Sequence, residues 1–213
     1  MRSVKTLLVP YYEHPTERPD AWDALLAAAD RLYGVVLNPA SGPGAAPDPA
    51  FAVVAGRLRA AGVRVLGYAD TDYGRRPHAA VVRELLCHRD WYGTDGAFLD
   101  QVSAEPEALP HYRRLAVAAR TAGARTLVLN HGVHPDPAYA ELADLLVTFE
   151  GPWDAYGSLA VPLWTAAHPR ERFCHLVYAA PPDAHVAAAV QCVVPGAGVH
   201  PWGTLPHALE PIR

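Results

Sequence analysis

The sequence is poor in lysine and in cysteine. Of its 18 basic residues only Lys5 is a lysine, so the Gly-Lys-Ser/Thr element of a P-loop is absent and Schiff-base chemistry is nearly excluded. The three cysteines, Cys87, Cys174 and Cys192, form no CxxC pair and no even-numbered set. We therefore expect three free, buried thiols rather than a disulfide framework.

Long apolar runs and excess positive charge are also missing. No stretch reaches the roughly 18 apolar residues of a membrane span, so the sequence predicts no membrane association. The net charge of −4 offers no basic surface for a phosphate backbone, which argues against a nucleic-acid partner. The first apolar run ends at Pro10 and is shorter than a secretory leader. We expect a cytoplasmic protein as the chain stands, or a secreted one if a leader was removed.

What the chain does have is a series of short apolar runs bounded by turn residues. The runs are continuous rather than alternating, as in parallel strands buried on both faces. They follow one another at intervals of about 30 residues, the length of a βα unit, with helical periodicity between them. The predicted strands cover residues 7–9, 35–37, 63–68, 97–99, 126–129, 145–149 and 176–178, with an eighth near 192–194.

This alternation predicts a parallel sheet with helices outside it. Eight units within 213 residues predict a compact (β/α)8 TIM-type barrel, with residues 1–213 forming a single domain. An open doubly wound sheet is the alternative. It is disfavoured because no glycine-rich nucleotide turn follows the first strand.

Polar and aromatic residues follow the predicted strands at the points where these end. In a parallel barrel such positions share the C-terminal rim, where active sites of this fold lie. Amides and carboxylates bind sugar hydroxyls and aromatic rings cover sugar faces, so the rim suits a carbohydrate partner. The predicted substrate-binding residues are Tyr11, Asn38, Tyr68, Asp70, Tyr73, Asn130, Trp153 and Tyr178.

Two carboxylates, Asp100 and Glu150, directly follow hydrophobic strands. Partial burial there raises the pKa of a carboxyl group unless a partner opposes it. One predicted strand separates theirs, so the two can face each other across the barrel mouth. That is the arrangement that glycoside hydrolysis needs. The alternative is a structural ion pair with an arginine such as Arg75 or Arg125.

Several of these segments carry a family resemblance. The motifs are Asn-Pro-x-Ser-Gly-Pro-Gly at residues 38–44 and Gly-Tyr-x-x-Thr-x-Tyr-Gly-Arg at residues 67–75, and the matching stretches are 8–12, 36–44, 66–76, 96–101, 128–130 and 143–150. In these stretches, which span about two thirds of the chain, the sequence resembles the spherulation-specific family 4 proteins. That family consists of (β/α)8 proteins and includes glycoside hydrolases acting on galactosamine-containing polysaccharides.

The resemblance implies a glycosidase-like site with Asp100 and Glu150 at the family's acidic positions. The family typically has Asp-Glu at the end of strand four, whereas this chain has Asp100-Gln101. Glutamine transfers no proton, so Gln101 is expected to bind substrate. Asp100 is assigned as nucleophile or charge stabiliser, and Glu150 as general acid/base. The alternative is a non-catalytic or diverged intracellular carbohydrate-binding barrel.

A metal-dependent hydrolase is a further alternative because His131 and His134 follow strand five. However, no HxH ends strand one and no HExxH is present, so the usual hydrolase metal ligands are missing. The sequence predicts neither a metal site nor an organic cofactor, and both histidines are expected to pack in a loop.

Overall fold

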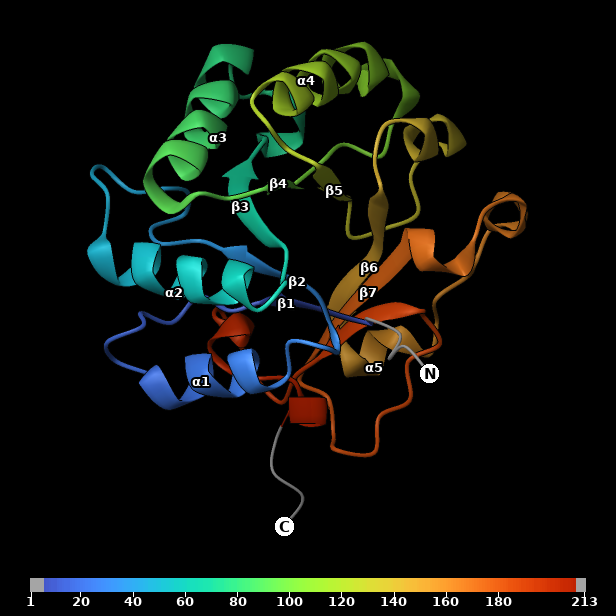
Figure 1. The fold of residues 1–213 in the computed structure, drawn as a ribbon. Helices are drawn as coiled ribbons and strands as arrows, with labels where there is room; N and C mark the ends of the chain where they lie inside the picture. Colours follow the sequence, from blue (N-terminus) through green and yellow to red (C-terminus); the bar gives the residue numbers. More distant parts are fainter. Residues whose placement is uncertain (1–5, 210–213) are drawn as a thin grey trace.

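The strands of the protein close into a barrel in which every neighbouring pair is parallel (Figure 1). The computed structural model describes residues 6–209. Strand order follows the sequence, and β8 pairs back with β1. The predicted (β/α)8 barrel is thereby confirmed, and the open sheet is excluded. The strands are β1 Leu7–Pro10, β2 Leu32–Leu37, β3 Val65–Asp70, β4 Gly96–Asp100, β5 Thr126–Asn130, β6 Leu145–Pro152, β7 Phe173–Tyr178 and β8 Val190–Val193.

Long crossover helices cover only the first half of the barrel (Figure 1). The helices are α1 Pro19–Ala27, α2 Pro49–Ala60, α3 His78–Tyr92, α4 Leu109–Thr121 and the single-turn α5 Trp153–Tyr156. From β5 onward, short 3-10 helices and loops replace the full crossovers, as at Leu163–Ala167 between β6 and β7. None of the helices within residues 6–209 is both long and apolar enough to cross a membrane.

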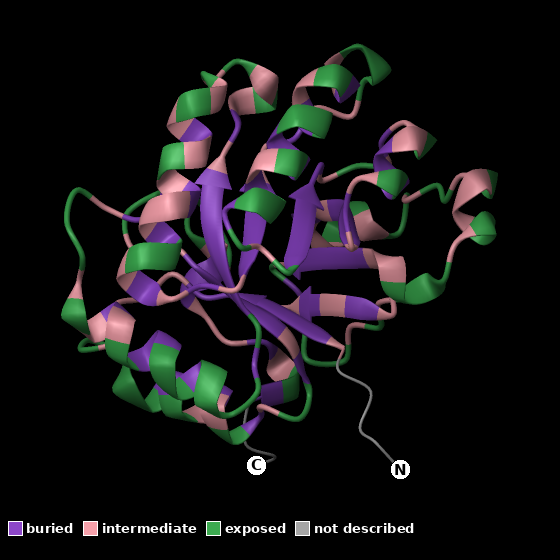
Figure 2. Ribbon diagram, turned by 45° about the horizontal axis from the view of Figure 1, so that its top comes forward, coloured by how far each residue is buried: buried purple, intermediate pink, exposed green. Residues whose placement is uncertain are grey.

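The strands are continuous apolar runs because both of their faces are buried. Figure 2 shows them almost wholly buried at the centre, with exposed residues on the outer faces of the surrounding helices. Local signals set the helix ends. Asp48 caps α2 by accepting a hydrogen bond from the Ala50 amide at 2.8 Å, and Pro49 fits the first helical position. Gly93 ends α3 in the left-handed conformation, at φ 64°.

A bulge in β6 decides which way its C-terminal half points. Opposite β7, Val147 pairs with Cys174 and Phe149 pairs with the next residue, His175, so Thr148 is the extra residue. Val147 packs in the barrel interior, whereas Phe149 belongs to a cluster with Val177. With strict alternation, Glu150 would face opposite to Val147. The bulge shifts the phase and turns Glu150 into the barrel mouth.

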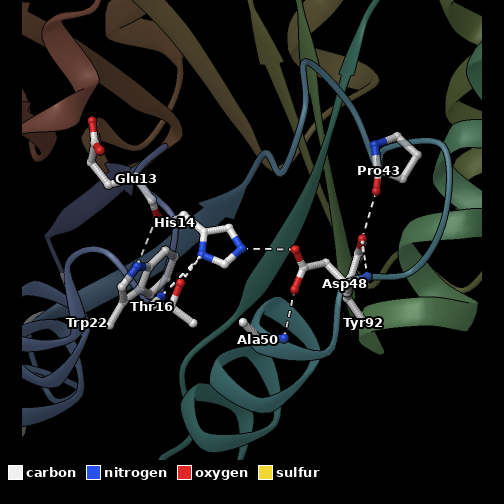
Figure 3. A network of polar contacts seen from close by, with 8 residues as sticks. All are labelled: Glu13, His14, Thr16, Trp22, Pro43, Asp48, Ala50 and Tyr92. Carbon is white, nitrogen blue, oxygen red and sulfur yellow. Dashed lines mark hydrogen bonds and ion pairs between the residues drawn. The ribbon is translucent and has the colours of Figure 1, made fainter.

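The rim loops after β1 and β2 are tied together by a polar network (Figure 3). His14 bridges the two loops, with Nε2 2.9 Å from the Asp48 carboxylate and Nδ1 2.8 Å from the Thr16 hydroxyl. The hydrogen bond from His14 lowers the pKa of Asp48. The Tyr92 hydroxyl of α3 donates to the Pro43 carbonyl at 2.7 Å. The loop that follows β2 is thus anchored both to its neighbour and to α3.

The cysteines are free thiols, as expected. Cys174 of β7 and Cys192 of β8 are buried in the barrel interior. Cys87 on α3 is only half-buried, so the prediction that all three are buried is wrong for this residue. A side chain of a helix that flanks the barrel keeps one edge toward solvent.

Gly67 is the point at which α3 packs closely on the barrel, and it gives a stability prediction. A Cβ atom at Gly67 would lie 2.7 Å from Cβ and Cγ of His88, whose Nε2 is 2.8 Å from the Tyr68 carbonyl oxygen. Gly67→Ala must push α3 outward, and we expect a loss of about 1–3 kcal/mol in the free energy of unfolding by urea. The exposed Gly56 of α2 has open space around it, so Gly56→Ala should gain about 0.5–1 kcal/mol. Equal stability of Gly67→Ala and wild type would contradict this packing.

Candidate active site at the barrel mouth

Asp100 and Glu150 lie in one open pocket at the C-terminal mouth of the barrel. The pocket has a volume of about 510 Å³. Each carboxylate is positioned by a strand end, Asp100 as the last residue of β4 and Glu150 just after the bulge of β6. The remaining lining residues are Tyr73, Gln101, Asn130, His131, Gly132, Val133 and Tyr178.

Asn130, at the end of β5 between the two acidic strands, holds both carboxylates. Its Nδ2 donates to Asp100 Oδ1 at 2.7 Å and to Glu150 Oε2 at 2.5 Å. Its Oδ1 accepts from the Gly132 amide at 3.1 Å, which fixes the orientation of the side-chain amide. Because Asp100 Oδ1 and Glu150 Oε2 contact the same nitrogen, these two oxygens lie no more than about 5 Å apart.

Asp100 is partly buried, yet it is well supplied with hydrogen-bond donors. Burial raises the pKa of Asp100, and the negative charge of Asp70 adds to this rise. The Tyr68 hydroxyl donates to Asp100 Oδ2 at 2.8 Å, and the Gln101 amide and Asn130 donate as well. These three donors oppose the rise because they favour the ionised carboxylate.

Glu150 has the more strongly shifted acid group of the pair. Burial, followed by the negative charge of Asp100, raises the pKa of Glu150 to about 7. Hydrogen bonds from Asn130 and the Trp202 indole oppose the rise only in part. The raised pKa favours the protonated form of Glu150, whereas the three hydrogen-bond donors around Asp100 favour its ionised form.

The first pair of tyrosines after β1 is divided between the core and the mouth. Tyr11 is fully buried and packs edge-on against Trp22, with ring centroids 5.3 Å apart. Tyr12, rather than the predicted Tyr11, lies beside the carboxylates: burial first, and then the charge of Asp100, raises its pKa. Tyr12 also forms a side-chain hydrogen bond with Asn38. Consecutive residues leaving a strand point to opposite sides.

Asp70 and Asn38 shape the loops of the mouth and do not line the pocket. Asp70 accepts from the Asp72 amide at 2.7 Å, and Asn38 accepts from the Gly42 amide at 2.7 Å. The turn that Asp70 holds leads into Tyr73, whose φ is 54°. Left-handed backbone at a non-glycine residue carries strain, and such strain clusters at functional sites.

Tyr73 and Gln101 face each other across this edge of the pocket. The Tyr73 amide donates to the Gln101 carbonyl at 2.7 Å, and Gln101 has φ 48°. Half of the Tyr73 side chain stays exposed. An exposed ring and a free amide side chain at the rim can contact a sugar.

Of the two remaining predicted residues, one lines the pocket and the other does not. Tyr178, at the end of β7, lines the pocket and packs edge-on to Trp202 with ring centroids 6.1 Å apart. Trp153 instead stacks on Tyr156 and packs with the Phe149 cluster, away from the mouth. Trp202 adds a further aromatic residue to the site, because its side chain forms a hydrogen bond with Glu150 as well as packing on Tyr178.

Among the described residues, neither carboxylate is held in an ion pair. Arg75, one of the expected partners, pairs with Asp72. Within residues 6–209 no arginine forms an ion pair with Asp100 or Glu150. Both acids therefore face open space and each other rather than a guanidinium.

The two histidines that follow β5 lie in different surroundings. His131 is buried against Tyr139, with ring centroids 4.7 Å apart, and its Nδ1 lies 3.0 Å from the Ser103 carbonyl oxygen. Burial lowers the pKa of His131 to about 4. His134 lines a different cavity. In the described part of the chain, no group of three or more metal-ligating side chains is close enough to hold an ion.

Fold and site together define a (β/α)8 barrel with a partly buried carboxylate pair at its C-terminal mouth. Residues 6–200 match the model of spherulation-specific family 4, and the chain belongs to that family. Spherulin-4 of Physarum polycephalum is 33% identical over 149 residues, covering 68% of this chain and 44% of the relative. The chain thus spans less than half the length of that relative.

Solved structures show the same fold. The crystal structure of Sph3 from Aspergillus clavatus in complex with GalNAc has a TM-score of 0.78 at 20% identity, covering 96% of this chain and 94% of that one. The spore cortex-lytic enzyme SleL of Bacillus cereus has a TM-score of 0.55 at 10% identity, covering 83% and 50%. At these identities the similarity concerns the fold.

Proposed function

We propose that this barrel is a glycoside hydrolase that cleaves a galactosamine-containing polysaccharide or oligosaccharide. The observation that carries the proposal is the carboxylate pair itself. Asp100 and Glu150 share one amide donor in an open pocket, and burial raises the pKa of Glu150 to about 7. A carboxyl group with a pKa near neutral beside a second carboxylate that has more hydrogen-bond donors suits the acid and base pair that glycoside hydrolysis requires.

The protonation states assign the roles. Glu150, protonated, gives its proton to the glycosidic oxygen as the bond to the anomeric carbon breaks. Ionised Asp100 attacks that carbon, forming a glycosyl ester, or stabilises its positive charge. Glu150, now ionised, then takes a proton from the incoming water as the water oxygen bonds to the anomeric carbon and any bond from that carbon to Asp100 breaks, which regenerates the Asp100 carboxylate and completes hydrolysis. The two nearest carboxylate oxygens lie no more than about 5 Å apart, which is below the range of inverting enzymes (about 6.5–9.5 Å) and closer to that of retaining ones (about 5–5.5 Å), so we expect retention at the anomeric carbon.

The substrate class is supported from two sides. The resemblance to spherulation-specific family 4 implies hydrolysis of galactosamine-containing polysaccharides, and a barrel of the same fold has been crystallised with GalNAc. The mouth offers Tyr73 and Tyr178 as ring surfaces and Gln101 as an uncharged donor and acceptor. These groups suit the hydroxyl and acetamido groups of an amino sugar.

A non-catalytic carbohydrate-binding barrel is the second candidate function. It is favoured by Gln101, which stands where the family typically has a second acid beside Asp100. A binding protein tolerates the loss of one carboxylate at this position. Its pocket would hold the same glycan without turnover.

Released reducing ends distinguish the two functions. The wild-type protein is incubated with oligosaccharides of galactosamine and N-acetylgalactosamine, and the Asp100→Asn/Glu150→Gln double variant serves as the control. An enzyme releases reducing ends that the double variant does not, while calorimetry shows that the variant still binds. Binding by both proteins with no release by either contradicts the hydrolase and supports the binding protein.

The pH profile of kcat/KM should have two limbs with separate origins. Activity falls above about pH 7 because Glu150 loses its proton, and it falls at low pH because Asp100 gains one. Tyr68→Phe removes a donor to ionised Asp100, so the pKa of Asp100 rises and the acidic limb moves up by about 1–2 pH units. Tyr33→Phe, at the opposite end of the barrel, is the matched control. An acidic limb that stays in place in Tyr68→Phe would show that Asp100 does not set it.

A further inference from the structure

A second cavity, of about 460 Å³, lies outside the barrel against β6 and β7. It opens where a crossover helix is missing: the chain between β6 and β7 contains only α5 and short 3-10 helices, and the chain between β7 and β8 contains no helix. In Figure 1 this orange segment extends away from the barrel next to β6 and β7. The volume lies within the range of small-molecule sites.

Apolar and aromatic side chains form most of its wall. Phe173 of β7 lines it together with Leu159 and Val161 from the β6–β7 connection. Alternate residues of β7 face the barrel core, so Phe173 and His175 face outward into this cavity. The walls thus suit a flat, largely apolar ligand.

The inner end of the cavity carries a polar group that has no hydrogen-bond partner in the described part of the chain. Thr148, the bulge residue of β6, is fully buried, and its Oγ1 has no hydrogen-bond partner. A buried hydroxyl without a partner is unfavourable and rare, and here it lines a cavity. The bulge that turns Glu150 into the mouth also places Thr148 outside the barrel.

His175 supplies a donor beside Thr148. The Tyr156 hydroxyl accepts from the Ala187 amide at 3.0 Å and lies 2.9 Å from His175 Nδ1. When the Tyr156 hydroxyl donates its proton to Nδ1, the neutral His175 ring carries its own proton on Nε2 and can donate it to a ligand. Burial lowers the pKa of His175 to about 4, which keeps the ring neutral at ordinary pH.

The outer end is positively charged. Arg170 is exposed at the cavity and uses one of its donors on the Ala187 carbonyl, at 3.2 Å. Its guanidinium has further N–H groups for an anion. The titratable side chains that line the cavity are three histidines, Tyr156 and Arg170, and no carboxylate is among them.

From these contacts we infer that the outer cavity binds a small hydroxylated aromatic acid. Its ring lies against Phe173 and the apolar wall, its hydroxyl reaches Thr148 and His175 at the inner end, and its carboxylate meets Arg170 at the opening. This site is separate from the barrel mouth and does not depend on the proposed hydrolysis.

Matched probes test the inference by titration calorimetry on the whole protein. We expect 4-hydroxycinnamate to bind in a saturable manner, with cinnamate about tenfold weaker because it lacks the hydroxyl. Thr148→Val should lower the affinity for 4-hydroxycinnamate to that for cinnamate and leave the affinity for cinnamate unchanged. Arg170→Gln should lower the affinity for both acids but not that for 4-hydroxycinnamyl alcohol.

The folding control comes from the same substitution. Thr148→Val removes an unpartnered buried hydroxyl, so its Tm should equal or exceed that of wild type. No saturable binding at millimolar concentration would overturn the inference. The inference would also be overturned if Thr148→Val, folded by this criterion, bound both acids equally more weakly than wild type, or bound both as tightly as wild type.

Discussion

Replacing Glu150 with glutamine is expected to abolish turnover and at the same time to stabilise the fold. Glutamine keeps the shape of the side chain and an oxygen that can accept from Asn130 and Trp202, but it has no proton to transfer. Loss of general acid/base catalysis lowers kcat by at least about 10²-fold. Binding of the oligosaccharide should persist, because the lining rings and amides are unchanged.

The stability gain follows from the raised pKa of Glu150. Its folded pKa of about 7 lies above the ordinary value of 4.5, so the folded state holds this proton more tightly than the unfolded state does. Stability therefore falls as the pH rises from about 4.5 to about 7, and the ionised group remains unfavourable above that range. Glu150→Gln removes this term, worth up to about 3 kcal/mol at pH 8. At pH 4 the gain should vanish.

Urea unfolding at pH 4 and pH 8 beside the kinetic assay checks both effects. Glu107→Gln removes an exposed carboxylate and is the matched control, expected to change neither quantity. If Glu150→Gln cleaves the substrate at the wild-type rate, Glu150 takes no part in the reaction. A protein less stable than wild type at pH 8 shows instead that this carboxylate supports the fold.

Asp100→Asn is expected to give the other large effect. The substitution removes the negative charge that is to attack or stabilise the anomeric carbon, so kcat should fall by at least about 10²-fold. It also removes the second cause of the raised pKa of Glu150, the charge of Asp100. The pKa of Glu150 should therefore drop below about 7.

Carbon-13 NMR titration of the glutamate carboxyl groups measures that drop without any substrate. Asp90→Asn, an exposed position on α3 that pairs with Arg89, is the control and should leave the titration of Glu150 unchanged. If Glu150 titrates identically in Asp100→Asn and in wild type, the two acids do not interact, and the pairing of their roles fails.

The sequence pattern predicts all eight strands and the helices of the first half of the barrel, but not the irregular connections of the second half. Continuous apolar runs locate all eight strands because both faces of each strand are buried, and the eighth begins at Val190, slightly earlier than expected. The helices from α1 to α4 show apolar periodicity. The stretch from Trp153 to β8 has no such period, because irregular chain rather than a helix covers the outer face of β6 and β7 there.

The site shows the same division. Asp100, Asn130 and Glu150 could be placed at one mouth because parallel strands end at one rim. Which of Tyr11 and Tyr12 faces the mouth depends on the phase in which the chain leaves β1, and adjacent tyrosines carry no such signal. The bulge at Thr148 is equally silent in a strand that is apolar on both faces.

The central claim is that Asp100 and Glu150 act as one catalytic pair at the separation of a retaining enzyme, and the stereochemistry of the reaction tests it most directly. Proton NMR follows the anomeric signals of a galactosamine-containing oligosaccharide during the first minutes of incubation, before mutarotation mixes the anomers. The account predicts a first-formed product with the same anomeric configuration as the bond that is cut. A product of inverted configuration, or no product from a protein shown to be folded, would contradict it.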